Sequence, residues 1–199
     1  MKQRYLQRIF NPSLYLLASF ILCLTVSILV RFTFQSLDGN THLSFIHGLV
    51  YQVYFLTGSL SILSLGSFIL LVSFEISNRI YHDSVINLLK SIWQTLSMRR
   101  FLSQSEHSET VTIMDNTTVT RHNPINKHFN KMVKKVIVDV RNDKVTLIIK
   151  LPNKQQATKI LKDMEVLISE EISNRNPDFY FSRPERKGKW LTFIGTKRE

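Results

Sequence analysis

The sequence predicts a membrane protein in which a two-helix transmembrane hairpin is followed by a small cytosolic α+β domain. Three observations lead to this fold class. Residues 9–30 and 39–74 contain no Lys, Arg, Asp or Glu, whereas residues 121–199 hold 18 of the 26 basic residues. Between residues 110 and 194, short β-branched runs alternate with turn residues, as in strands. Outside the apolar part about 90 to 100 residues remain, which suffices for one small domain and excludes a large multidomain enzyme.

The expected organisation has seven segments. In chain order they are a cytoplasmic N-terminus (1–12), a first transmembrane helix (13–31), a periplasmic loop (32–50), a second transmembrane helix (51–75), a membrane-proximal amphipathic helix (76–102), a linker (103–109) and a basic cytosolic α+β domain (110–199).

The first span is expected over residues 14–30, where eleven residues are Leu, Ile, Val or Phe. Each favours insertion by roughly 0.3 to 0.6 kcal/mol. No small-residue cleavage motif follows at 28–32, which favours an uncleaved anchor over a signal peptide.

The second span is expected over residues 53–74, with thirteen strongly apolar residues. A buried core helix is the alternative for either run, but so small a chain has too little protein to bury two of them.

Basic flanks predict the orientation, because Lys and Arg are retained on the cytoplasmic side. The loop at 32–48 has no Lys or Arg, and 38–40 reads as its turn. We therefore expect an inner-membrane protein with both termini in the cytoplasm. The flanking cations are Lys2, Arg4 and Arg8 before the first span, and Arg79, Lys90, Arg99 and Arg100 after the second.

The second span carries small residues on two faces, and small residues let transmembrane helices approach closely. One face could pack on the first span and the other on another copy of the chain, which predicts a homo-oligomer. The ordinary abundance of small residues in transmembrane helices is the alternative. The first face consists of Thr57, Ser61 and Ser64, and the second of Ser59, Gly66 and Ser73.

Apolar residues at helical spacing predict a membrane-proximal helix, with Asp83 or Ser84 as its cap. We expect its apolar face to dock on the soluble domain. The alternatives are contact with anionic lipid, aided by Lys90, Arg99 and Arg100, or direct continuation of the second span. The apolar positions are Val85, Ile86, Leu89, Ile92, Trp93 and Leu96.

The soluble domain is expected to have the order ββ, ββ, α, ββ, with a sheet backed by one helix. The expected elements are a hairpin of strands 110–114 and 117–120 around Asp115 and Asn116, a second hairpin of strands 135–141 and 145–151, a helix over 155–172, and a last strand pair, 179–181 and 190–194, around a turn at 183–188.

Basic residues give residues 121–199 a net charge of +9 out of the chain's +11, since 18 cations face 9 acids. Such an excess favours polyanions, here nucleic acid or the anionic inner leaflet. A solvated basic surface is the alternative. The candidate contacts form two clusters, Lys131, Lys134 and Lys135, and then Arg183, Arg186, Lys187 and Lys189 beside Tyr180 and Trp190.

The sequence contains no recognisable catalytic or metal-binding motif. His42 and His47 are spaced off one helical face, and the other histidines considered, His107, His122 and His128, are expected in loops. There is no P-loop or GxSxG motif, and the single Cys23 forms no disulfide framework. We therefore expect no enzyme, no metal site and no cofactor.

The two spans at 14–30 and 53–74, the membrane-proximal helix and the basic domain together resemble the two-transmembrane effector proteins of bacterial retron anti-phage systems. The resemblance covers the whole chain as architecture. It implies an inner-membrane toxin held inactive by a reverse transcriptase with its DNA–RNA product. Infection would release the effector to damage the membrane, halting the host cell in an abortive infection. No functional residue is carried over.

Two other classes compete with this reading. One is a membrane-anchored interaction subunit of a conjugation or secretion apparatus. The other is a cyclic-nucleotide-gated defence effector, which would need a ligand cavity in the soluble domain. A neighbouring gene for a reverse transcriptase, a transfer ATPase or a nucleotide cyclase would favour the first, second or third class respectively.

Overall fold

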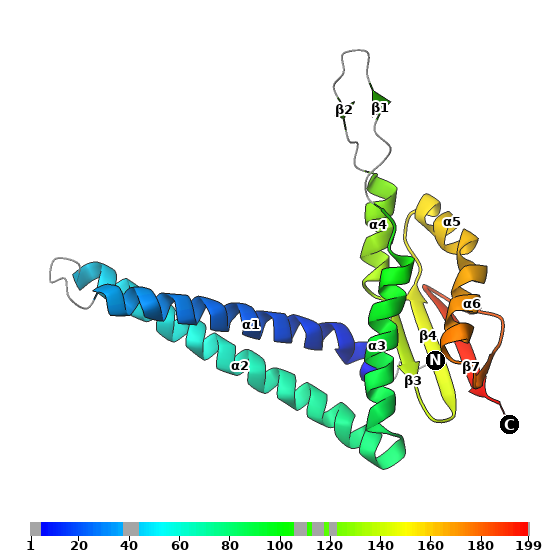
Figure 1. Ribbon diagram of the computed structural model, residues 1–199, viewed down its shortest axis with the longest axis horizontal. Coiled ribbons are helices and arrows are strands. Elements are labelled where there is room, and N and C mark those ends of the chain that lie inside the picture. The colour runs from blue at the N-terminus through cyan, green and yellow to red at the C-terminus, as the bar shows by residue number, and fades with distance from the viewer. Residues whose placement is uncertain (1–4, 38–43, 106–110, 113–117, 120–122, 199) are drawn as a thin grey trace. The chain divides into compact units, whose positions relative to one another are not determined.

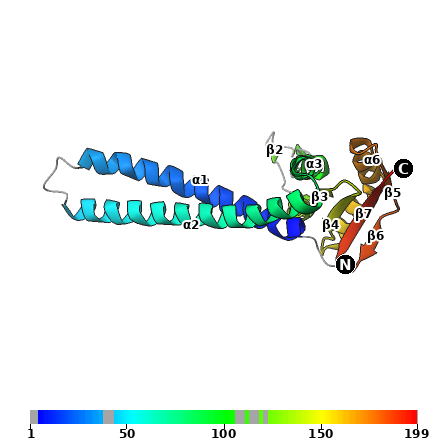
Figure 2. The ribbon, with the colours of Figure 1, turned by 90° about the horizontal axis from the view of Figure 1, so that it is seen from below.

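The computed structural model describes residues 5–37, 44–105, 111–112, 118–119 and 123–198. The chain forms two compact units, residues 1–78 and 79–199. The first unit holds α1 (Tyr5–Leu37) and most of α2 (Ser44–His82), which pack as a hairpin (Figures 1 and 2). The predicted turn at 38–40 lies outside the described residues.

Both helices are longer than the expected spans. The segments Arg8–Thr33 and Gly48–His82 are long and apolar enough to cross a membrane. A helix keeps its backbone hydrogen bonds in water as well as in lipid, so apolar length predicts the inserted part and not the helix ends. At 1.5 Å per residue, α2 is on the order of 58 Å long, well beyond a hydrocarbon core of about 30 Å.

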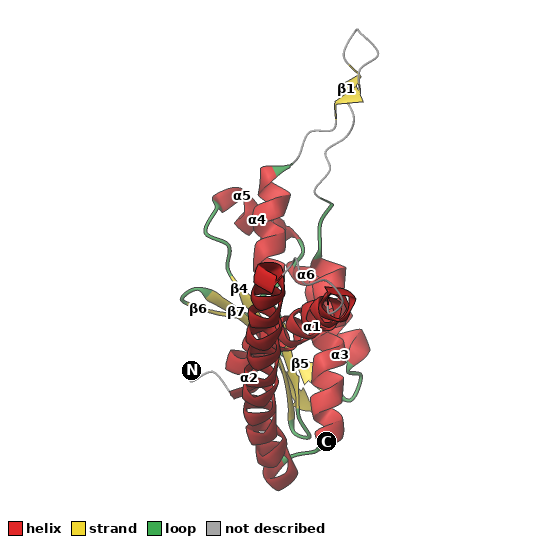
Figure 3. Cartoon of the chain, turned by 90° about the vertical axis from the view of Figure 1, so that its left-hand side faces the viewer, coloured by secondary structure: helices red, strands yellow, loops and turns green. Residues whose placement is uncertain are grey.

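The second unit contains the remaining elements, shown by type in Figure 3. They are α3 (Val85–Leu102), β1 (Val111–Thr112), β2 (Thr118–Val119), α4 (Pro124–Val133), β3 (Ile137–Val140), β4 (Lys144–Lys150), α5 (Gln155–Asp163), α6 (Glu165–Arg175), β5 (Phe179–Phe181), β6 (Glu185–Lys187) and β7 (Trp190–Lys197).

The main sheet is antiparallel, with the order β3-β4-β7-β5, and β6 also pairs with β7. The hairpin expected over residues 135–151 is confirmed, since Ile137 pairs with Ile148 and Val140 with Val145. β1 and β2 also pair antiparallel, but the turn expected between them lies outside the described residues.

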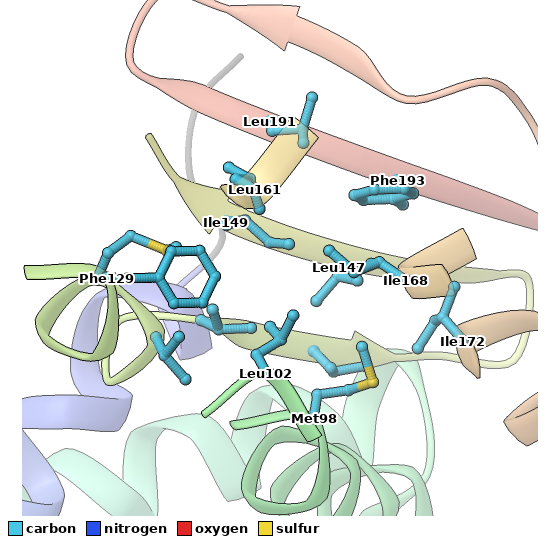
Figure 4. Close-up of a cluster of buried hydrophobic side chains, with 14 of the residues drawn as sticks. Met98, Leu102, Phe129, Leu147, Ile149, Leu161, Ile168, Ile172, Leu191 and Phe193 are labelled. Carbon is cyan, nitrogen blue, oxygen red and sulfur yellow. The ribbon is translucent and has the colours of Figure 1, made fainter. Parts of the chain in front are cut away.

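One face of the sheet forms the core, and four helices contribute to it rather than the single helix expected. Figure 4 shows these side chains converging between the layers. They include Met98 and Leu102 of α3, Phe129 of α4, Leu161 of α5, Ile168 and Ile172 of α6, and Leu147, Ile149, Leu191 and Phe193 of the sheet.

Three expectations about the domain are wrong. Residues 124–133 form α4, which begins where Asn123 accepts hydrogen bonds from the backbone N–H groups of Ile125 and Asn126. His128 therefore lies in a helix and not in a loop. The helix expected over 155–172 is divided at Met164 into α5 and α6. The turn expected at 183–188 contains β6, and Gly188 closes it at φ 61°, a conformation that favours glycine.

The membrane-proximal segment is also divided, because α2 continues to His82 and α3 begins at Val85. Ser84 caps α3 as expected, accepting from the Ile86 N–H at 3.2 Å. The expected docking of its apolar face on the domain is wrong. The residues of α3 that are buried are largely polar, while Ile86, Leu89 and Trp93 are exposed.

Side-chain hydroxyls explain this reversed orientation of α3. β3 is an edge strand, and edge strands leave backbone groups without a strand partner. The Val138 N–H donates to Thr95 Oγ1 at 2.9 Å, and the Val140 N–H donates to Ser91 Oγ at 2.8 Å. Arg99 Nε donates to the Val136 carbonyl at 2.9 Å. The polar face of α3 thus takes the place of a further strand.

Candidate functional site

The first basic cluster lies at the C-terminal end of α4. Lys131 and Lys135 line a pocket of about 380 Å³, whereas Lys134 is the exposed C-cap residue beside it. We call this cavity the lysine pocket. Its other lining residues come from the α4 side, from the end of β4 and from the turn before α5, namely His128, Met132, Lys150, Leu151, Pro152, Asn153 and Lys154.

The charge of the lysine pocket is one-sided. Four lysines and a histidine line it, and none of the described lining residues is acidic. Like charges gathered in a concave site raise the local positive potential and favour an anion with several oxygen atoms. The pocket can therefore hold phosphate groups without an opposing carboxylate.

The start of α5 adds to this potential. Lys154 is its N-cap residue and, within the described residues, makes no side-chain capping hydrogen bond. The N–H groups of a first helical turn carry partial positive charge and favour anions. The turn that contributes Asn153 and Lys154 to the pocket thus leads directly into a helix N-terminus.

The second basic cluster lies on and around β6, with Arg183 before the strand, Arg186 and Lys187 in it, and Lys189 after it. Trp190 pairs with Lys150 on β4 and with Lys187 on β6, so these three residues share one row across the sheet. Lys150 Nζ lies 5.9 Å from the centroid of the Trp190 ring. This row connects the lysine pocket with one residue of the second cluster.

The positive charge of Lys187 is partly compensated by Glu185. Its ammonium lies 2.8 Å from Glu185, and the hydrogen bond and the charge from Lys187 hold the pKa of Glu185 below its usual value. A second basic cavity of about 320 Å³ lies between α3 and the ends of β3 and α6, but Asp178 lines it and Arg175 is bound to Glu171. Of the two cavities, the lysine pocket is thus the one whose lining has no acidic residue to oppose an anion.

Arg79 forms the second notable site. It lies in the last turn of α2 and is fully buried. Its guanidinium pairs with Asp83 at 2.6 Å and with Asp139 of β3 at 2.5 Å, and donates to the Val140 carbonyl at 2.7 Å. We call this network the Arg79 junction, and through it the last turn of α2 is part of the second unit.

Asp83 extends the Arg79 junction. It accepts from Asn87 Nδ2 at 2.9 Å and from the Asn142 backbone N–H at 3.1 Å. Burial alone would raise the pKa of Asp83, but the hydrogen bonds from Asn87, Arg79 and the Asn142 backbone outweigh it and leave the pKa below its usual value. Asp83 is therefore held in its ionised form.

The small residues of α2 occupy two different environments. Ser61 and Ser64 are buried, and Ser64 Oγ donates to the Leu16 carbonyl of α1 at 2.7 Å, while Thr57 is half-buried. Gly58 belongs to the same contact, since a Cβ there would lie 3.7 Å from Ser27 Oγ. This side of α2 is the one that packs on α1.

Ser59, Gly66 and Ser73 are exposed. A Cβ at Gly66 would meet no described atom within 4 Å. Ser59 lies in an apolar depression of about 520 Å³, lined by Phe55, Leu56, Leu60 and Leu63 with Gln52. The hairpin therefore leaves this side of α2 without a packing role within the described residues.

Sequence reasoning missed the Arg79 junction and half of the lysine pocket. In the sequence, Arg79 indicates only the orientation of the second span, because its pairing with Asp139 depends on the fold. Lys150 and Lys154 flank a Pro-Asn turn between a strand and a helix, which is the one local signal that could have found them.

Comparison with other proteins adds no functional assignment. No protein-family model matches this chain, and no curated protein or solved structure matches it either.

Proposed function

We propose that this protein is an inner-membrane effector whose basic domain binds a nucleic-acid-containing partner and whose hairpin perturbs the membrane. The observation that carries the proposal is the Arg79 junction. A simple tether needs only a flexible linker, whereas here the last turn of the candidate span Gly48–His82 carries the buried Arg79, which pairs with Asp139 of β3. A change of the domain can thus act directly on the helix that would cross the membrane.

In this proposal, the lysine pocket is the site that binds the nucleic-acid-containing partner. The four lysines that line it and the start of α5 suit a chain of phosphates, with Lys131 and Lys135 as central contacts. The resemblance to retron effectors adds the identity of that partner, a reverse transcriptase with its DNA–RNA product. While the partner is bound, the effector is inactive, and its loss on phage infection starts abortive infection.

The exposed small residues of α2 are the proposed contact between copies of the hairpin in the membrane. Once released, copies of the hairpin associate through Ser59, Gly66 and Ser73, where backbones can approach closely. This action requires no catalytic residue and no cofactor, so the proposed effector is not an enzyme.

Expression of the chain without its partner tests the membrane side. Wild type should depolarise the inner membrane and stop growth, and Gly66→Leu should abolish both effects while remaining in the membrane fraction. Ala18→Leu is the matched control, because Ala18 is an exposed small residue on α1. If Gly66→Leu remains fully toxic at normal levels, an interaction subunit of a conjugation or secretion apparatus becomes the better proposal.

Binding of the full chain to single-stranded nucleic acid tests the partner side. Charge reversal by Lys131→Glu with Lys135→Glu should weaken binding at least about tenfold. It should also reduce the slope of log K against log salt by about 1.4, since each lost phosphate contact removes about 0.7. Lys159→Glu on α5, exposed and outside the pocket lining, is the control. Equal effects of both variants would mean that only net charge matters.

A further inference from the structure

α3 presents an apolar stripe to the outside of its domain. Ile86 is 65% exposed, Leu89 63%, Trp93 73% and Leu96 48%. Their spacing of three or four residues places them on one face of the helix. A helix of a soluble domain normally turns such a face toward the core.

The opposite face of α3 explains why the stripe does not fold inward. Ser91 and Thr95 are fully buried and serve the free edge of β3. Because α3 docks through this opposite face, the apolar side chains of the stripe are not part of the domain's core. Removing apolar side chains from water is favourable, so their exposure favours an occupant.

We propose that this apolar stripe lies on the surface of an anionic membrane, at the level of the lipid headgroups. Continuity with α2 is the first argument. α3 begins three residues after α2 ends, and Ile80 and Tyr81 in the last turn of α2 are also exposed. Large apolar side chains thus continue from the end of the candidate span onto α3.

Charge is the second argument. Lys90 borders the stripe, Arg100 continues it beyond Leu96, and both are exposed. Residues 85–102 contain no Asp or Glu. A Lys or Arg near an anionic leaflet is attracted to the lipid headgroups, and tryptophan favours the interface.

The same charges exclude a second copy of this chain as the occupant. Two copies that met through this face would bring Lys90 and Arg100 of each close together without a carboxylate on either α3. A lipid bilayer instead supplies both the apolar layer and the anionic groups. The stripe is therefore complementary to a membrane and not to itself.

The inference rests on the proposed insertion of the hairpin, and adds to it a second lipid contact. α3 then connects the membrane surface with the edge of the sheet, since its two faces serve lipid and β3. Loss of this contact would leave the domain attached to the bilayer through α2 alone.

Tryptophan fluorescence of the full chain in lipid nanodiscs tests this contact. The chain has two tryptophans, so Trp190→Phe leaves Trp93 as the only reporter, and Trp93→Phe gives the background from Trp190. Trp93 should be quenched by lipids brominated near the headgroup more than by deeply brominated lipids. It should also be shielded from aqueous iodide, and more strongly in discs that contain phosphatidylglycerol.

Lys90→Glu with Arg100→Glu should reduce the quenching to the level seen in zwitterionic discs. Free access of iodide with no quenching by brominated lipid, in a chain that resists carbonate extraction, would overturn the inference and leave the proposed function standing. Shielding from both quenchers would overturn it in favour of a protein partner. Release of the chain by carbonate would refute hairpin insertion, and with it both proposals.

Discussion

Both α2 and α3 expose large apolar side chains, but the two helices do so for different reasons. On α2, Ile62 and Leu70 are exposed, while Ser61 and Ser64 are buried and Ser64 donates a hydrogen bond to α1. A helix in lipid gains nothing by hiding apolar groups, and close packing selects small ones. The pattern on α2 is therefore the one expected of a span.

α3 belongs to a domain with an ordinary apolar core, so its pattern has another origin. Its buried hydroxyls, Ser91 and Thr95, satisfy the edge of β3. The comparison shows that apolar exposure alone does not distinguish a span from a surface helix. What the buried face binds does distinguish them: a neighbouring span for α2, and the edge of a sheet for α3.

The largest expected effect follows from breaking the Arg79 junction, which joins the last turn of α2 to β3. Arg79→Met keeps the length of the side chain but removes the guanidinium that pairs with Asp83 and Asp139, and the ion pair that Asp139 retains with Arg141 is longer, at 3.3 Å. Loss of one partner of a buried ion pair costs about 3 to 5 kcal/mol. Chemical unfolding of the full chain in micelles, followed by tryptophan fluorescence, measures this. Arg100→Met, at an exposed cation, is the control, and an equal loss in both variants would contradict the role of the junction.

A smaller effect is expected from the polar face of α3. Thr95→Val keeps the shape of the side chain but leaves the buried Val138 N–H without an acceptor, which costs about 1 to 3 kcal/mol. Leu89→Ala on the exposed face should change the free energy of unfolding by less than about 0.5 kcal/mol. The same unfolding measurement compares them. A larger loss for Leu89→Ala would show that the apolar face stabilises the domain.

The third effect on stability comes from the ionised carboxylate of Asp83, and it depends on pH. Because the pKa of Asp83 is lower in the folded state, its contribution is complete above the unfolded pKa of about 3.9 and is lost as pH falls through the folded value. Asp83→Asn should therefore lower stability by about 1 kcal/mol at pH 7. The difference from wild type should shrink in acid. A difference that stays constant from pH 7 to pH 3 would argue against this role for the ionised carboxylate.

The sequence predicts the elements whose signal is local. Long uncharged apolar runs predict α1 and α2, and alternation predicts β3 and β4, because both signals come from one segment at a time. α4 was missed although Asn123 and Pro124 form a standard helix start. The apolar stripe of α3 was found, but which face docks depends on the free edge of β3, some 40 residues further along the chain.

The candidate sites likewise combine residues with a local signal in the sequence and residues that only the tertiary structure brings together. Lys131 and Lys135 were found as a local cluster, whereas Lys150 and Lys154 join them only because β4 and α5 meet at the end of α4. Arg79 pairs with Asp139, which is 60 residues away. Such convergence is a property of the tertiary structure, and no spacing in the sequence reports it.

Depth measurement by spin labels tests the central claim, that α2 crosses a bilayer and α3 lies on its surface. With Cys23 replaced by serine, single labels at Ile62, Leu89 and Val166 compare α2, α3 and an exposed apolar position on α6 of the same domain. In nanodiscs, relative access to oxygen and to a polar nickel complex should place Ile62 deep in the bilayer, Leu89 near the headgroups and Val166 in water. If Leu89 matches Val166, α3 does not lie on lipid, and if Ile62 matches Val166, the hairpin does not cross the membrane.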